Sequence, residues 1–296
     1  MNRRRPAVEH SPVERPQRPA AGFTLVELVI VITLTGVVAV LASVLVGNQM
    51  LGYVDTARRA GLMAKADLAL QHIARDLRGA APYSIRISSG TALEWVPIQN
   101  WGRYRKLPDA SEDAALDFSR PDAQFEVLFG SAMPAVASGM QLVIGNTDAA
   151  GTDGINLYGD VSSGTLVPAG SNVITPTTVA VGSSGNSITL TPAFQFALAS
   201  LASRFYLVDG AASYVCSGGA VTRYTGYPLQ KTQPVSGAVA PLGTATSALL
   251  LDGVSSCQFG YTALDSTYGV VSVQMQLQDG SETVSMTRMI TIENRP

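Results

Sequence analysis

The chain has 296 residues and a formal net charge of −2; 46% of its residues are hydrophobic and only 14% are charged. That length allows a membrane helix and one sizeable globular domain. The absence of a basic surplus argues against nucleic acid as a partner. With two histidines, two cysteines and no GxSxG, HExxH, CxxC or Walker-type motif, we expect no enzymatic activity, no cofactor and no bound metal.

Basic residues are concentrated at the start of the chain. Residues 1–22 contain five arginines and two glutamates, a net charge of 5 − 2 = +3, and several prolines. The remainder holds 15 basic and 20 acidic residues, a net charge of 15 − 20 = −5. Because positive residues stay on the cytoplasmic side of a membrane, we expect the N-terminus inside and the residues after Gly47 outside.

An apolar run follows the basic segment. From Leu28 to Gly47 no side chain carries a formal charge, which is about the length of a helix that crosses a bilayer. Glu27 is the only ionisable residue from Phe23 to Gly52. A carboxylate in such a segment costs about 2 to 3 kcal/mol or more, so we expect Glu27 to have a function.

The residues at the start of this run form a motif. Gly22, Phe23, Thr24, Leu25 and Glu27 match the G/F-T-L-x-E pattern, and the small residue precedes the apolar core, whereas in a secretory signal peptide it follows. The motif resembles that of type IV prepilins and type II secretion pseudopilins. The resemblance implies that prepilin peptidase cleaves after Gly22 and methylates the new amine of Phe23. It also implies that Glu27 pairs with the N-terminal amine of a neighbouring subunit, which would compensate both charges. The alternative is an uncut signal anchor with an incidental Glu27.

One helix of about 55 residues is expected. From Tyr53 to Arg78 there is no proline and apolar residues recur at helical spacing, while Gly79 and Pro82 give a stop signal. The resemblance implies an α+β, pilin-like fold in which this helix packs on a large antiparallel β-sheet domain. The expected domains are a leader peptide (1–22), a transmembrane and assembly helix (23–52), its amphipathic half (53–79) and a β-rich periplasmic or extracellular head (80–296).

The head alternates between apolar and polar residues over short segments, which is typical of strands with one buried face. Hairpins are predicted where two such segments flank a turn, most clearly around Asp279-Gly280. The expected hairpins are 84–88 with 92–96, 212–217 with 220–224, and 271–277 with 284–292; the expected single strands are 125–129, 141–144, 187–191, 204–208 and one within 248–261.

Cys216 and Cys257 both fall in the part expected to be exported. In an oxidising compartment they can pair. Closing a loop of about 40 residues would contribute on the order of 4 kcal/mol to stability in the chain-entropy treatment. Two free buried thiols are the alternative.

Two groups of head residues could bind a ligand. Asn146, Asp148, Asp153 and Asp160 lie among glycines between 145 and 187 and could offer oxygen ligands to calcium, although their spacing matches no known loop motif and solvated turns are the alternative. A second group could form an aromatic surface or pack in the core: Trp95, Trp101, Tyr104 and Arg105.

His72 is the only histidine after the leader, because His10 precedes Gly22. A general base built on histidine would therefore have to be His72. A single histidine on a helix is more often a surface or packing residue, so we assign it no catalytic role.

Segments of the C-terminal part resemble minor pilins of the mannose-sensitive haemagglutinin (MSHA) pilus. This resemblance implies an inner-membrane protein with a periplasmic C-terminal domain, later part of an extracellular pilus used in adhesion. Its partners would be prepilin peptidase, other pilin subunits, the inner-membrane assembly platform and membrane lipid. The alternatives are a J-type pseudopilin of a type II secretion system and a membrane-anchored binding module that is never assembled. The resembling segments are 52–60, 66–70, 204–209, 214–216, 223–227, 257–261 and 292–296.

Overall fold

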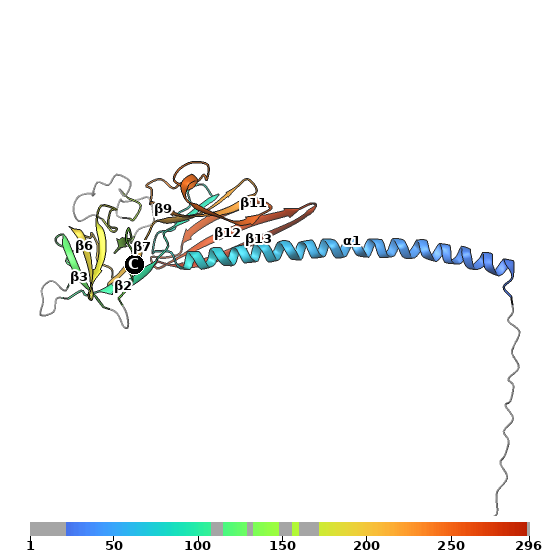
Figure 1. Ribbon diagram of the computed structural model, residues 1–296, viewed down its shortest axis with the longest axis horizontal. Coiled ribbons are helices and arrows are strands. Elements are labelled where there is room, and N and C mark those ends of the chain that lie inside the picture. The colour runs from blue at the N-terminus through green and yellow to red at the C-terminus, as the bar shows by residue number, and fades with distance from the viewer. Residues whose placement is uncertain (1–21, 108–114, 129–132, 148–155, 160–171, 295–296) are drawn as a thin grey trace, which may run out of the picture. The chain divides into compact units, whose positions relative to one another are not determined.

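The computed structural model describes residues 22–107, 115–128, 133–147, 156–159 and 172–294, with residues 46–51 described by their backbone alone. The chain divides into two compact units, Met1–Asp55 and Thr56–Pro296. Figure 1 shows a single long helix and a β-rich part. The predicted α+β pilin-like fold, an apolar N-terminal helix followed by a large antiparallel β domain, is confirmed.

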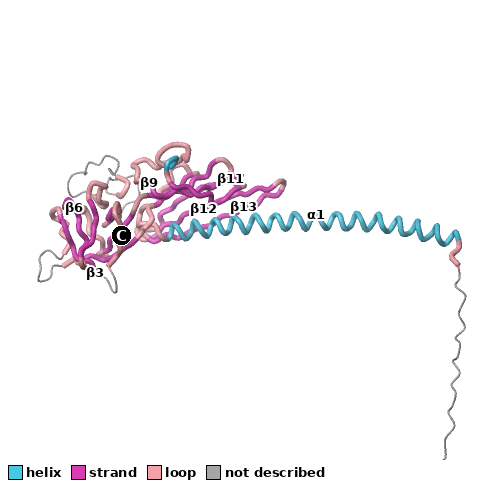
Figure 2. Tube along the Cα trace, in the orientation of Figure 1, coloured by secondary structure: helices cyan, strands magenta, loops and turns pink. Residues whose placement is uncertain are grey.

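Helix α1 runs from Leu25 to Arg78, 54 residues, and is drawn in cyan in Figure 2. It agrees with the predicted length of about 55 residues. No proline interrupts it. It ends where expected: the Gly79 amide donates to the Asp76 carbonyl at 3.0 Å, and Arg75 and Arg78 place positive charge in the last turn, where the helix dipole favours it.

Two antiparallel sheets lie in the part of the head that contacts α1. The first has the order β1-β8-β9-β10, with β1 (Ala92–Trp95), β8 (Ala211–Ser217), β9 (Ala220–Tyr227) and β10 (Thr246–Asp252). The second has the order β11-β12-β13, with β11 (Val254–Ala263), β12 (Tyr268–Asp279) and β13 (Glu282–Glu293).

A third antiparallel sheet has the order β4-β7-β2-β3-β6-β5. Its core contains aromatic rings; Phe125 and Phe205 meet edge to face with centroids 5.9 Å apart, an arrangement that favours aromatic pairs. Its strands are β2 (Asn100–Tyr104), β3 (Asp122–Leu128), β4 (Gln141–Val143), β5 (Ala180–Ser184), β6 (Ser187–Phe194) and β7 (Arg204–Val208).

The second half of α1 packs on the first two sheets. Its buried residues recur every three or four positions, and those of β12 recur every second position, so each element presents one apolar face. The two faces belong to one hydrophobic cluster. They consist of Leu62, Ala66, Ala69, Leu70, Ile73, Ala74 and Leu77 on the helix and Val271, Val273, Met275 and Leu277 on the strand.

The last hairpin is confirmed, with β12 and β13 paired in continuous register from Tyr268↔Glu293 to Asp279↔Glu282. The hairpin predicted for 84–88 with 92–96 is confirmed at one position only. Residues 84–88 form no strand but an isolated antiparallel bridge, Arg86↔Glu94, while β1 pairs along its whole length with β8. Elsewhere in this segment the Ser84 amide donates to the Ala81 carbonyl at 3.1 Å, and Gln233 Oε1 accepts from the Ser88 amide at 2.8 Å.

The strand expected within 248–261 is two strands. Gly253, at φ +69°, separates β10 from β11, a backbone conformation that glycine adopts without strain. As a result β10 pairs with β9 while β11 pairs with β12, and the bend joins the first two sheets.

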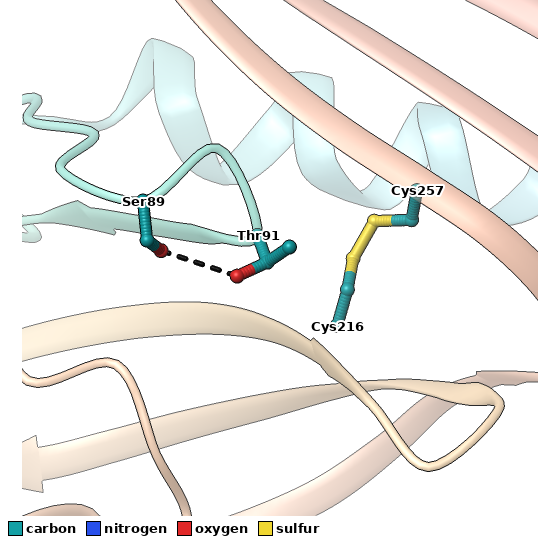
Figure 3. Close-up of a disulfide and its surroundings, with 4 residues drawn as sticks. All are labelled: Ser89, Thr91, Cys216 and Cys257. Atoms are coloured by element: carbon teal, nitrogen blue, oxygen red, sulfur yellow. Dashed lines mark hydrogen bonds between the residues drawn. A yellow bond between two sulfur atoms is a disulfide. The ribbon is translucent and has the colours of Figure 1, made fainter.

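Cys216 and Cys257 form a disulfide, with Cα atoms 6.2 Å apart and a sequence separation of 41. Figure 3 shows the bridge, which connects β8 to β11. The Thr91 carbonyl accepts from the Cys216 amide at 2.8 Å, and the Gly90 carbonyl accepts from the Phe259 amide at 2.7 Å. The first two sheets are therefore joined by a covalent bond and by a turn that contacts a strand of each.

Candidate assembly site

Gly22 and Phe23 precede α1 and are exposed, Phe23 by 78%. The peptide bond between them therefore lies outside the hydrogen-bonded helix. A Cβ at Gly22 would meet no atom within 4 Å, and the residue has no positive φ. Packing against the residues that the structure describes thus gives no reason for a glycine at this position.

Thr24 caps the helix. The Glu27 amide donates to Thr24 Oγ1 at 3.3 Å, and the Leu28 amide donates to the Thr24 carbonyl at 3.1 Å. Thr-x-x-Glu is also the sequence pattern of a capping box, which would have predicted the Thr24 cap; among the described residues only the Thr24 side chain takes part in it. A carboxylate in the first helical turn is also favoured by the helix dipole.

The helix from Leu25 to Leu45 could cross a membrane by length and composition, with a mean hydropathy of 2.8 and no buried residue. Its hydroxyl groups bond to the helix itself: Thr33 Oγ1 donates to the Val29 carbonyl at 3.0 Å and Ser43 Oγ to the Val40 carbonyl at 2.8 Å. Because of these internal bonds, the hydroxyl groups need no hydrogen-bond acceptor from lipid or from another protein segment. The apolar surface of this segment has no partner within the described residues.

Glu27 is the exception on that surface. It is exposed, and no side chain of the described residues forms an ion pair or hydrogen bond with its carboxylate. A partner for this charge must come from outside the described part of the chain.

The comparisons with known proteins agree with this N-terminal geometry. Residues 17–43 match the prokaryotic N-terminal methylation motif. The comparison with curated proteins and that with solved structures found no match. The motif supports a type IV pilin-like protein, a class that includes prepilins and pseudopilins, and the exposed apolar helix suggests anchoring in a membrane.

A second charged site lies inside the head. Glu94 on β1 is fully buried, and its Oε1 accepts from Arg86 Nη2 at 2.7 Å and Nε at 3.0 Å. The Arg86 guanidinium lies over the Tyr158 ring, 3.7 Å from its centroid. Glu94 Oε2 has no hydrogen-bond partner in the described part of the chain. Burial raises the pKa of Glu94, and the neighbouring Arg86 charge opposes that shift.

A third site connects α1 to the first sheet. Asp76 Oδ2 accepts from the Tyr214 hydroxyl at 2.6 Å and from Arg223 Nε at 2.7 Å. Tyr214 in turn stacks on Trp95, with centroids 4.9 Å apart. Burial, followed by the contact with Asp76, raises the pKa of Tyr214 above its usual range. These contacts are structural because they fix the helix against the sheet.

The proposed aromatic surface does not form. Trp95 and Tyr104 are buried, Trp101 is 58% exposed on β2, and Arg105 pairs with Glu126. The core alternative is therefore correct for Trp95 and Tyr104.

The candidate calcium ligands are only partly described. Asn146 is buried and structural: its Nδ2 donates to the Pro82 carbonyl at 2.7 Å and its Oδ1 accepts from the Leu157 amide at 3.1 Å. Asp148, Asp153 and Asp160 lie outside the described residues. Within those residues no group of three or more His, Cys, Asp or Glu side chains could hold a metal. His72 is exposed on α1.

Proposed function

We propose that the protein is a minor pilin of an MSHA-type pilus, cut by prepilin peptidase between Gly22 and Phe23 and methylated on the Phe23 amine. The observation that carries the proposal is Glu27: a single carboxylate without a partner in the described chain, at the start of a fully exposed apolar helix that bears the methylation motif.

The chemistry of cleavage supports a specific role for this carboxylate. Cutting after Gly22 would expose an ammonium group at Phe23, four residues before Glu27. In an apolar environment an unpaired carboxylate and an unpaired ammonium are both costly. Pairing Glu27 of one subunit with the Phe23 amine of the next would satisfy both and would fix the stagger between neighbouring helices.

The exposed Gly22–Phe23 junction fits the same proposal. Since no packing in the chain demands a glycine there, its small size is best explained by recognition in a peptidase active site. The mature chain would keep its apolar helix in the inner membrane, with the head in the periplasm, until the assembly platform moves it into the filament.

The head suggests where the subunit would act. It comprises three sheets and about two hundred residues after α1. A subunit with a large head is accommodated most easily at the filament tip, where its bulk need not repeat along a lattice. Immunogold labelling should therefore mark pilus ends, and even labelling along the shaft would contradict this placement.

Mass spectrometry of the N-terminus tests the processing step. Protein from the membrane fraction should begin at N-methylated Phe23. Glu27→Gln should still be processed, because the cap bond to Thr24 Oγ1 comes from the backbone amide of residue 27 and not from its side chain, but should be lost from sheared filaments. A working protein that retains Met1 to Gly22, or a Glu27→Gln variant that assembles normally, would contradict the proposal.

A further inference from the structure

A surface groove runs along the second half of α1. It has a volume of about 650 Å³ and lies between one face of the helix and strand β10. Lys65, Leu68 and His72 belong to the helix wall, and Ala248 to Asp252 form the strand wall. From Lys65 to Asp76 the helix rises about 16 Å, so the groove is long enough for about five residues of extended chain.

The strand wall is a sheet edge without a neighbour. β10 is the last strand of its sheet, and in the described part of the chain β9 alone pairs with it. The edges at β1 and β4 are each covered by an isolated bridge, Arg86↔Glu94 and Val143↔Ile174, whereas no residue that the structure describes forms such a bridge to β10. An uncovered edge offers a row of unpaired main-chain donors and acceptors.

The side chains of β10 show the same lack of a partner. A strand at the surface of a domain normally buries alternate residues, yet Thr246, Ser247, Ala248 and Leu249 are all exposed. Leu249 is 65% exposed, and Leu68 on the helix wall is 59% exposed. A register shift between Leu249 and Leu251 limits the regular part of the edge to Thr246–Leu249.

The charges of the groove define the chemistry of an occupant. Its two acids are already compensated: Asp76 accepts from Tyr214 and Arg223, and Asp252 pairs with Lys65 at 3.5 Å. The helix rim also carries His72 and, seven residues after Leu68, the exposed Arg75, which has no ion-pair partner among the described residues. Arg75 therefore gives the rim one positive charge that has no ion-pair partner among the described residues.

We propose that this groove binds an extended segment of another protein chain, which adds a strand to the β1-β8-β9-β10 sheet at β10. A strand is the occupant that matches the unpaired main chain of the edge, and strand addition beside a helix is a known mode of peptide recognition. The segment would place apolar side chains against Leu68 and Leu249 and a carboxylate near Arg75. This proposal does not depend on the role of Glu27.

Site-specific photo-crosslinking of the full chain in its native membranes tests the proposal. A photoreactive residue at Leu249 should crosslink to a second polypeptide. Moving it to Ser247, about 7 Å along the strand, should move the crosslinked residue of the partner by two positions if that partner is a strand. A helical partner would shift by four or five positions, and that result would overturn the proposal.

Edge-blocking variants provide the matched control. With the photoreactive residue at Leu68, Leu249→Lys should lower crosslinking about tenfold, because lysine on an edge strand opposes pairing. Leu264→Lys changes a leucine of similar exposure, 62%, outside the groove and should have no effect. Arg75→Glu should weaken crosslinking, whereas Arg58→Glu, about 25 Å away along the helix, should not. Equal crosslinking in Leu249→Lys and Leu264→Lys, or none in any membrane preparation, would reject the groove as a docking site.

Discussion

The two halves of α1 have different partners. From Leu25 to Leu45 every side chain is exposed although nearly all are apolar. From Leu62 to Leu77 one apolar stripe is buried against the sheets of the head. The second half is thus explained by contacts within the chain, whereas the first half has no apolar partner among the described residues, which suggests anchoring in a membrane.

The two carboxylates Glu27 and Glu94 differ in the same way as the two halves of α1, because one has a partner within the described part of the chain and the other does not. Glu94 is buried and paired with Arg86 inside the head, whereas Glu27 is exposed and has no partner among the described residues. Changes in the head should therefore alter its own stability. Changes in the first half of α1 should matter only where a membrane or other subunits are present.

Loss of Arg86 should have the largest effect on the head. Arg86→Met leaves Glu94 buried and unpaired, which should lower the free energy of unfolding by about 3 to 5 kcal/mol. Urea unfolding of the full chain in detergent micelles measures this loss. Tryptophan fluorescence can monitor the unfolding because Trp95 is buried beside Tyr214. Glu27→Gln is the control and should leave the transition unchanged; equal loss in both variants would remove the distinction between the two charges.

Removal of the disulfide should lower the free energy of unfolding nearly as much as the loss of Arg86. Cys216→Ala with Cys257→Ala opens a loop defined by a separation of 41 residues, worth about 4 kcal/mol if the bond acts by restricting the unfolded chain. Urea unfolding of the double variant, compared with the oxidised wild-type protein, measures this loss, and the reduced wild-type protein should unfold like the double variant. Membrane integration should be unaffected; loss of integration would indicate that the head and the anchor fold together.

A matched pair of truncations tests the two halves of the helix directly. Ile73→Ala removes a fully buried side chain and should destabilise the head by about 3 kcal/mol. Val38→Ala, at a position 62% exposed, should leave head unfolding within about 0.5 kcal/mol of wild type. A similar loss from both would mean that the first half also packs within the chain.

A change in pH should have a smaller effect on the stability of the head. Because burial raises the pKa of Glu94 in the folded state, the folded protein binds this proton more tightly than the unfolded chain. The stability contribution of Glu94 should therefore fall as the pH rises from 4.5, the ordinary pKa of a glutamate, through the raised pKa of the folded state. The free energy of unfolding of the wild-type protein, measured relative to that of Glu94→Gln, should rise as the pH is lowered from neutral toward 4.5. If the difference between the two proteins does not change with pH, the Arg86 charge cancels the effect of burial on the pKa of Glu94.

Sequence periodicity predicted the helix and the last hairpin because both are long and have one buried face. It missed β2 and β5, which are five residues each and contain glycine. It also predicted a strand at 84–88, where alternation was present but only Arg86 pairs with the neighbouring segment, through an isolated bridge to Glu94. A local sequence pattern shows where apolar and polar residues alternate, but it does not show which other segment a strand pairs with.

The charged and functional residues also differ in whether the sequence alone could point to them. Gly22, Phe23 and Glu27 could be named as candidates because their motif is contiguous in sequence, and their roles stay predictions. The Arg86–Glu94 pair could not, since all four residues of β1 are buried and an alternating pattern would place Glu94 on a solvent face. Its partners come from segments far apart in the chain, including Tyr158.

The smallest effect is expected where α1 meets the head at the surface. Lys65 and Asp252 lie 3.5 Å apart with side chains 61% and 66% exposed, so Lys65→Met should change head stability by no more than about 1 kcal/mol. Urea unfolding at low and high salt measures this, and the small difference should vanish at high salt. A larger, salt-independent loss would show that the second half of α1 is held to the head by this pair as well as by its buried stripe.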